Sequence, residues 1–225
     1  MLIGILNCGH FAKRPGAPKR DYDDIYAQFL DGHGFTFRAW HVVDMDFPDS
    51  VQDADGWLLG GSKYGVYEDI PFIEPLKAFV REAYAAGVPT VGICFGHQLI
   101  ASALGGHVEK FSKGWAMGHA DYDFEGEALV LNAFHQDQVI TLPADARRLA
   151  SNAFCENAAL AYKGRAMSVQ PHPEFTQEDM ALLYEVRAPQ LVASDHLAAV
   201  RRREGEANDN AAMARRIAAF YKGVA

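Results

Sequence analysis

Short apolar runs alternate with amphipathic segments over the first half of the chain. A short apolar run bounded by turn residues is typical of a buried strand, whereas apolar residues three and four positions apart indicate a helix. The strands predicted in this way are 2–7, 35–43, 56–59 and 88–93, and the helices are 21–32, 71–86 and 98–104. Strands that alternate with helices predict an α/β fold, in which a mostly parallel central sheet is covered by helices on both faces.

The pattern changes after residue 106, where short strands follow one another and turns join them. These strands are predicted at 107–111, 122–124, 128–134, 159–162 and 166–169. Short strands joined by turns indicate a small additional antiparallel sheet.

A helix and a tail follow the last predicted strand. Residues 176–179 read Thr-Gln-Glu-Asp, a helix-capping pattern, and they predict a helix that runs to about residue 187. After Pro189 the composition shifts to Ala, Arg, Glu and Asn, and two amphipathic helices are predicted at 190–204 and 209–222. We therefore expect a main domain over 1–187 and a C-terminal helical extension over 188–225 that packs on it. A lid or a docking site for a partner is the alternative role of this extension.

A cysteine stands at the sharp turn between the strand at 88–93 and the helix that follows it. Residues 92–98 read Gly-Ile-Cys-Phe-Gly-His-Gln, so that Gly92 and Gly96 flank Cys94 in the pattern Gly-x-nucleophile-x-Gly. The glycines let the backbones approach closely and the turn exposes the sulfur, while the positive end of the helix favours a thiolate. We predict that Cys94 is a nucleophile; the alternative is a buried core thiol.

An unperturbed thiol is mostly protonated at neutral pH, so this nucleophile needs a base and the base needs a partner that orients it. Residues 170–175 read Gln-Pro-His-Pro-Glu-Phe after an apolar run that is predicted to be a strand. His172 would lie at the end of that strand, and Glu174 is close enough in sequence to bind its other ring nitrogen. These residues predict a triad of Cys94, His172 and Glu174.

The two motifs, together with the strand and glycine turn at 57–62, closely resemble the class I glutamine amidotransferase domain over roughly residues 1–187. The resemblance implies a flavodoxin-like three-layer sandwich that hydrolyses the side-chain amide of glutamine through a γ-glutamyl thioester. The oxyanion of that reaction needs backbone donors. We expect them to be Phe95 and either Gly61 or Ser62, and Lys63 stands where many family members have proline.

Three further residues are candidates for binding the substrate. Gln98 lies one helical turn after Cys94, and the resemblance implies that it helps to hold glutamine; an ordinary helix residue bonded to a loop is the alternative. The segment with His135 and Asp137 is similar to the part of the family that receives the amino-acid end of glutamine. Asp137 could pair with the substrate ammonium, and His135 could equally be structural.

Composition narrows the remaining classes of function. The formal net charge of the 225 residues is −8 at pH 7, which argues against nucleic acids and anionic membranes as partners. No apolar stretch approaches the ~20 residues of a membrane span, and the first residues lack the basic start of a signal peptide. Three cysteines without Cys-x-x-Cys spacing are typical of a cytoplasmic protein. No phosphate loop or metal-ligand spacing is present, so we expect neither cofactor nor metal.

Two other functions compete with glutamine hydrolysis. Plant γ-glutamyl peptidases also resemble this chain in the Cys-Phe-Gly-His-Gln and His-Pro-Glu-aromatic sequences, and such an enzyme would cleave a γ-glutamyl amide that carries a tail. The basic segment 11–20 could border the site and suit a tail with a carboxylate. A non-catalytic scaffold is the third hypothesis, and the intact triad argues against it. Besides a small-molecule substrate, a separate synthase is the partner that an amidotransferase of this kind could serve.

Overall fold

A nine-stranded sheet forms the centre of the computed structural model, which describes residues 1–14, 20–163 and 165–224. The strand order is β2-β1-β3-β4-β11-β10-β9-β6-β7. Its first five strands are parallel to one another, as the alternation of strands and helices predicts. These are β2 (Thr36–Trp40), β1 (Leu2–Leu6), β3 (Gly56–Leu59), β4 (Thr90–Ile93) and β11 (Ala166–Val169).

Antiparallel strands continue the same sheet on one side of β11. They are β10 (Ala159–Tyr162), β9 (Ala146–Ser151), β6 (Ala116–Phe124) and β7 (Glu127–His135). A separate antiparallel pair is formed by β5 (His107–Lys110) and β8 (Asp137–Thr141). The expected small antiparallel sheet is therefore present, while most of the short strands extend the main sheet instead.

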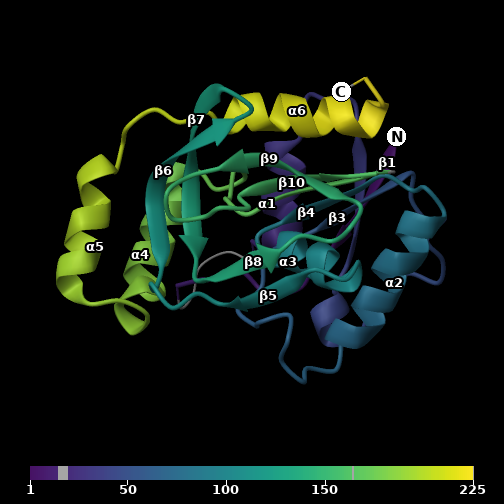
Figure 1. Cartoon of the computed structure of the whole chain (residues 1–225), viewed down its shortest axis with the longest axis horizontal. Helices are drawn as coiled ribbons and strands as arrows, with labels where there is room; N and C mark the ends of the chain where they lie inside the picture. Colours follow the sequence, from purple (N-terminus) through teal and green to yellow (C-terminus); the bar gives the residue numbers. More distant parts are fainter. Residues whose placement is uncertain (15–19, 164, 225) are drawn as a thin grey trace.

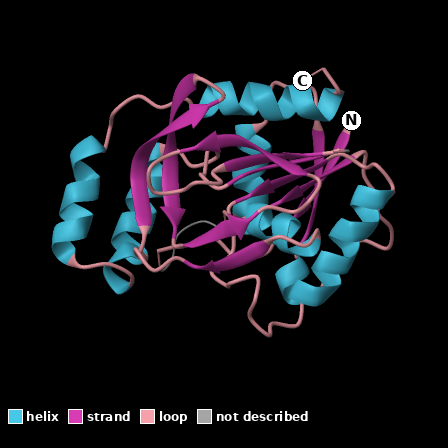
Figure 2. Cartoon of the chain, in the orientation of Figure 1, coloured by secondary structure: helices cyan, strands magenta, loops and turns pink. Residues whose placement is uncertain are grey.

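Helices cover both faces of the sheet (Figures 1 and 2). They are α1 (Tyr22–Phe29), α2 (Ile73–Ala85), α3 (Phe95–Ala103), α4 (Gln177–Val186), α5 (Ser194–Val200) and α6 (Asn210–Lys222). Single 3-10 turns occur at η1 (Val42–Asp44), η2 (Ala188–Gln190) and η3 (Arg201–Arg203). Neighbouring residues of one strand face opposite cores: Leu59 packs with α2 and α3, whereas Leu58 packs with α1 and α6. This alternation is the three-layer arrangement that buried parallel strands require.

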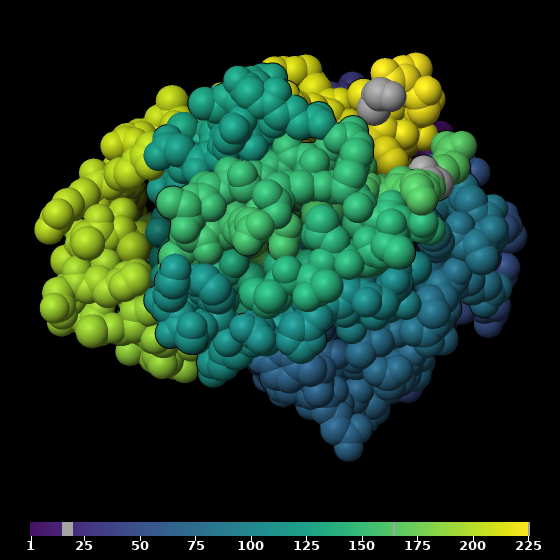
Figure 3. Space-filling model, viewed as in Figure 1, coloured from purple at the N-terminus to yellow at the C-terminus, as the bar shows by residue number. Residues whose placement is uncertain are grey.

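The two C-terminal helices differ in burial. In α6, Met213, Ile217 and Tyr221 are almost completely buried, and the Tyr221 hydroxyl donates to the carbonyl oxygen of Trp57 in β3 at 2.8 Å. In contrast, α5 has no buried residue and stands at one side of the molecule (Figure 3). The division at residue 187 stays a prediction, and α6 packs into the same core as β1 and α1. Among the described residues, no helix is both long and apolar enough to cross a membrane.

Candidate active site

Cys94 lies in the turn between β4 and α3, with φ of 54° and ψ of −103°. This is a left-handed backbone conformation that a residue with a side chain adopts only under strain. Both flanking glycines are required: a Cβ atom at Gly92 would lie 2.4 Å from the carbonyl oxygen of Gly96, and one at Gly96 would lie 2.3 Å from that of Leu59. The predicted elbow is therefore formed by close packing of three backbone segments around Cys94.

His172 and Glu174 follow β11, the strand that pairs with β4. Nδ1 of His172 lies 2.7 Å from Oε1 of Glu174, both side chains are almost fully buried, and the imidazole and Cys94 line the same cavity. Two further residues hold the imidazole in place. Its ring stacks on Phe175 at a centroid distance of 4.2 Å, and the backbone N–H of His172 donates to the carbonyl oxygen of Asn132 at 2.7 Å. The structure thus brings the three predicted residues together.

The charge state of this group follows from its surroundings. Burial alone disfavours the charged imidazolium, but the negative charges of Cys94 and Glu174 and the hydrogen bond to Glu174 raise the pKa of His172 to about 10. The ring therefore keeps its proton at neutral pH, in the same cavity as the sulfur of Cys94. This is the pairing that a cysteine nucleophile needs.

Backbone donors surround the space next to the sulfur. The N–H of Phe95 begins α3, and none of the backbone hydrogen bonds of the described residues uses it. The N–H of Gly61 donates instead to the hydroxyl of Tyr26 at 2.9 Å, and this tyrosine is fully buried. Of the two residues that the sequence left open as the second oxyanion donor, Gly61 is therefore engaged, while Ser62 lines the space in front of Cys94.

A cavity of about 610 Å³ extends from Cys94 and His172. One part of its lining is polar and contains all three predicted substrate-binding residues, Gln98, His135 and Asp137. Nε2 of Gln98 donates to the backbone carbonyl oxygen of Asp137 at 2.8 Å, and the hydroxyl of Tyr67 donates to the Asp137 carboxylate at 2.9 Å. Gln98 thus ties the strand end that carries Asp137 to the helix that carries Phe95.

His135 is a neutral donor or acceptor in this lining. Burial, and then the positive charge of His172, lower its pKa to about 3. Neither of its ring nitrogens has a hydrogen-bond partner among the described side chains. Burial also raises the pKa of Asp137, although the Tyr67 hydrogen bond opposes this shift. Buried His135 and half-buried Asp137 thus line the cavity with hydrogen-bonding capacity to spare.

The other part of the lining is apolar and comes from segments far apart in the sequence. It consists of Phe11, Ala12, Trp115, Phe134, Phe175, Leu183, Val186 and Leu191, with Arg187 among them. Of these residues, Phe11 and Ala12 belong to the basic segment 11–20 and Phe175 ends the His-Pro-Glu-aromatic sequence, while the others carry no mark in the sequence. Residues 15–19 of the basic segment lie outside the described part of the chain. The two arginines of this segment form ion pairs with residues of α4: Arg14 with Glu185, and Arg20 with Asp179. The positive charges of the lining therefore come from outside this segment, from Arg187, Lys63 and Lys110.

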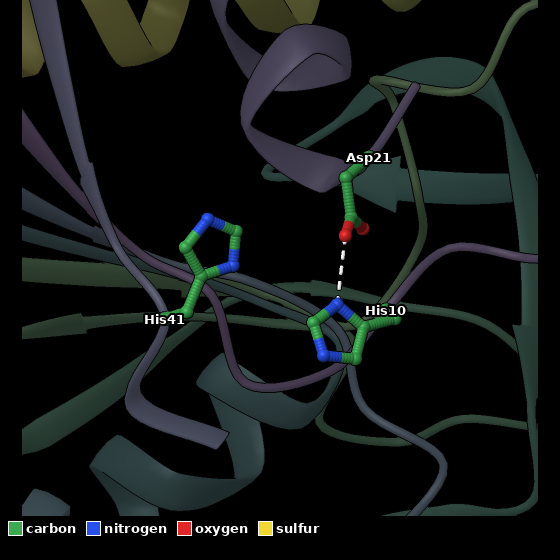
Figure 4. Close-up of side chains that lie close together, drawn as sticks. All are labelled: His10, Asp21 and His41. Carbon is green, nitrogen blue, oxygen red and sulfur yellow. Dashed lines mark hydrogen bonds and ion pairs between the residues drawn. The ribbon is translucent and has the colours of Figure 1, made fainter. Parts of the chain in front are cut away.

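One group among the described residues could hold a metal ion. His10, Asp21 and His41 each have a ligand atom within 4.8 Å of the others (Figure 4), and His10 also lines the cavity. The Asp21 carboxylate already accepts the N–H groups of Phe11 and Tyr22 and lies 2.8 Å from Nδ1 of His10. These hydrogen bonds account for the position of Asp21 as the N-cap of α1 without an ion.

Comparison with known proteins places these features in a family. The family model described as glutamine amidotransferase class-I matches residues 34–185. The chain is 26% identical over 192 residues to γ-glutamyl peptidase 4 of Arabidopsis thaliana, covering 78% of this chain and 75% of that protein. It is 36% identical over 163 residues to a glutamine-hydrolysing GMP synthase of Azoarcus, covering 62% of this chain and 30% of that protein. The crystal structure of a glutamine amidotransferase from Methylobacillus flagellatus is similar in fold, with a TM-score of 0.73 at 20% identity over 99% of this chain and 92% of that chain.

Proposed function

Because this chain belongs to the class I glutamine amidotransferase family, we propose that it hydrolyses the γ-amide bond of glutamine and related γ-glutamyl compounds with Cys94 as the nucleophile. The observation that carries the proposal is that Cys94 lines one cavity together with the buried imidazole of His172, which is hydrogen-bonded to Glu174. A cysteine next to an imidazole that a carboxylate orients is suited to acyl transfer.

The reaction follows from the positions of these groups. Sγ of Cys94 attacks the γ-carbonyl carbon, and the oxyanion accepts hydrogen bonds from the N–H groups of Phe95 and Ser62. His172 gives its proton to the nitrogen as the carbon–nitrogen bond breaks, which leaves a γ-glutamyl thioester and a free amine. Water then attacks the thioester, His172 takes up a proton from that water, and glutamate and the Cys94 thiolate are released. Glu174 keeps the ring oriented throughout and stabilises its charge.

The polar part of the cavity suits the glutamyl end of the substrate. Asp137 offers a carboxylate to the α-ammonium group, and the neutral ring of His135 offers a hydrogen bond nearby. Gln98 acts as a positioning residue, because its amide holds the backbone of Asp137.

The leaving group distinguishes two candidate activities. Glutamine releases ammonia, which a separate synthase would receive, and the chain matches only 30% of the length of the Azoarcus GMP synthase. A γ-glutamyl peptidase would instead release an amine with a tail. One observation favours this second activity: the cavity of about 610 Å³ has the volume of a pocket for a larger ligand, and apolar side chains such as Trp115, Phe134 and Leu191 line part of it. All three cysteines are free, which supports a reducing compartment such as the cytoplasm for either reaction.

The proposal is tested by the turnover of glutamine and of a γ-glutamyl dipeptide by purified protein. His172→Ala should lower kcat by a factor of about 1,000, within the range of general acid–base catalysis. Glu174→Gln should cost less, because an amide still orients the ring but does not stabilise its charge. His196→Ala, on the exposed helix α5, is the matched control and should keep full activity. Unchanged kcat in His172→Ala would exclude the triad, and unchanged kcat in Glu174→Gln would mean that another residue orients the imidazole.

A further inference from the structure

The apolar part of the cavity continues directly from the imidazole of His172. Phe175, on which the ring stacks, belongs to a hydrophobic cluster with Leu183 of α4, and Trp115, Phe134 and Leu191 pack against that cluster. Trp115 and Phe134 meet edge to face at 5.7 Å. Trp115, Phe134 and Leu191 are each only partly buried and line the cavity. They therefore expose apolar surface to a space that begins at the catalytic group.

Among the cations of the lining, Arg187 comes from the same part of the chain as Leu183 and Leu191. It follows α4 directly and lines the cavity. None of the ion pairs of the described residues includes it, whereas the neighbouring acidic side chains Glu185 and Asp179 are paired with Arg14 and Arg20. Arg187 lines the same cavity as Cys94 and His172, so a ligand that fills this cavity can reach both its guanidinium and the reaction centre.

We propose that Arg187 and the apolar surface of Trp115, Phe134 and Leu191 bind the amine half of a γ-glutamyl dipeptide whose second residue has an apolar side chain and a free α-carboxylate. The inference rests on the proposed function and specifies its substrate. Arginine binds carboxylates through two parallel hydrogen bonds, which gives both affinity and orientation. Burying an apolar side chain adds binding energy that glutamine, with ammonia as its leaving group, has no atoms to obtain.

Water is the only reactant besides the dipeptide that the reaction at this subsite needs. The bond that breaks joins the γ-carbonyl carbon of the glutamyl group to the α-nitrogen of the second residue. His172 delivers a proton to that nitrogen, and the apolar amino acid leaves from the Arg187 side. Water then hydrolyses the thioester on Cys94, so that one dipeptide and one water yield glutamate and a free apolar amino acid.

The test compares four substrates: γ-glutamyl-phenylalanine, its C-terminal amide, γ-glutamyl-glycine and glutamine. The native protein should prefer γ-glutamyl-phenylalanine over its amide by at least about tenfold in kcat/KM, which is the size of a charged hydrogen bond. The preference over γ-glutamyl-glycine should also be at least about tenfold, as expected for a buried aromatic side chain. In Arg187→Gln the ratio between acid and amide should fall to about one. A ratio taken within one variant is insensitive to the amount of active enzyme.

Two further variants complete the design. Arg202→Gln alters an exposed arginine that does not line the cavity, and it should keep the native ratio. Arg187→Lys retains the charge without the planar fork and should give an intermediate ratio, with circular dichroism to confirm that each variant folds. A native ratio near one, or a ratio that persists in Arg187→Gln, would overturn the subsite. Turnover of glutamine without turnover of either dipeptide would also overturn the subsite, while leaving the Cys94 chemistry intact. A folded protein that turns over none of the four substrates would refute the proposed function itself.

Discussion

Tyr26 connects the first helix to the turn beside the nucleophile. Its hydroxyl accepts the N–H of Gly61 at 2.9 Å, and a Cβ atom at Gly60 would lie 2.7 Å from its ring. A buried phenol that fixes one peptide of this turn also constrains the next peptide, whose N–H belongs to Ser62. We therefore regard Tyr26 as a positioning residue for the oxyanion site.

Removing this hydroxyl should affect the rate more than substrate binding. In Tyr26→Phe the N–H of Gly61 loses its buried acceptor, so the turn can move and kcat should fall by about tenfold with little change in KM. Tyr162→Phe is the matched control, since it removes another buried hydroxyl, which lies 3.3 Å from Oγ of Ser168 away from the cavity. Steady-state kinetics and urea unfolding of both variants make the comparison. Equal kcat in the two variants would mean that Tyr26 only stabilises the fold.

The parts of the site that lie in short motifs could be predicted from the sequence. Cys94 is marked by its two glycines, and His172 and Glu174 are separated by only one residue. Cys94 follows β4 and His172 follows β11, so they come together because these two parallel strands are neighbours. Tyr26 and Arg187 carry no such mark. Each reaches the site through tertiary packing of a helix, and a tyrosine or an arginine on an amphipathic helix is an ordinary residue. For the same reason the choice between Gly61 and Ser62 required the hydrogen bond to Tyr26.

At the scale of elements, the turn from β4 into α3 depends on atoms of β3. A Cβ atom at Gly96 would lie 2.3 Å from the carbonyl oxygen of Leu59, which is too close for any side chain. The N–H of Gly96 donates to the carbonyl oxygen of Gly60 at 3.1 Å. The first turn of the helix therefore packs directly on the end of the neighbouring strand. This close contact sets the position of Cys94 relative to the turn at Gly61.

A single methyl group should disturb this contact. Gly96→Ala should lower the free energy of unfolding by about 1–3 kcal/mol, as overpacking does, and should abolish most of the activity by displacing Cys94. Ala103→Gly weakens the same helix at its other end by about 1 kcal/mol and should keep its activity. The measurements are urea unfolding and γ-glutamyl hydrolysis. Native activity in Gly96→Ala would show that the elbow tolerates a wider turn.

Sequence patterns predicted the elements with buried, regular faces and missed the rest. The parallel strands and α2 were found because they are apolar or amphipathic with a clear period. Strand β9 was missed because Arg147 and Arg148 interrupt its pattern on an exposed face, and β8 was missed because it starts within the predicted substrate segment. The first half of β6 contains Gly118 at φ of 84°, which breaks the expected alternation. Helix α5 is shorter than the predicted helix at 190–204, because the 3-10 turn η2, which contains Pro189, precedes it and the 3-10 turn η3 follows it.

At the scale of the whole molecule, two buried histidines stay neutral in the folded protein because nothing around them stabilises their protonated form. Burial, and then electrostatic repulsion between the two protonated rings, lowers the pKa of His97 next to His135 to about 3. The pKa of His135 is also lowered to about 3, by burial and by the charge of His172. His97 lies in α3 with Nδ1 2.7 Å from Oγ of Ser168 in β11. Both rings are therefore neutral in the folded protein under conditions in which an unfolded chain would protonate them.

This difference predicts the direction of the acid stability of the fold. Between pH 6.5, the ordinary histidine pKa, and about pH 3, the unfolded chain binds protons that the folded protein does not, so the free energy of unfolding falls as pH falls. The slope should approach about 1.4 kcal/mol per pH unit for each histidine once pH is well below 6.5. Urea unfolding between pH 6.5 and 5 measures it, above the range in which most carboxylates titrate. His97→Gln should halve this slope, and a flat profile for the native protein would contradict the assignment of neutral, buried rings.

The most direct test of the account is which thiol carries the reaction. The protein would be treated with a glutamine-like electrophile, and the modified cysteine would be identified by peptide mass spectrometry with and without excess glutamine. We predict modification of Cys94 alone and slower modification in the presence of glutamine, because burial raises the pKa of Cys8 and raises that of Cys155 to about 12. Preferential modification of Cys8 or Cys155, or labelling of Cys94 that neither glutamine nor a γ-glutamyl dipeptide slows, would contradict a γ-glutamyl site at Cys94.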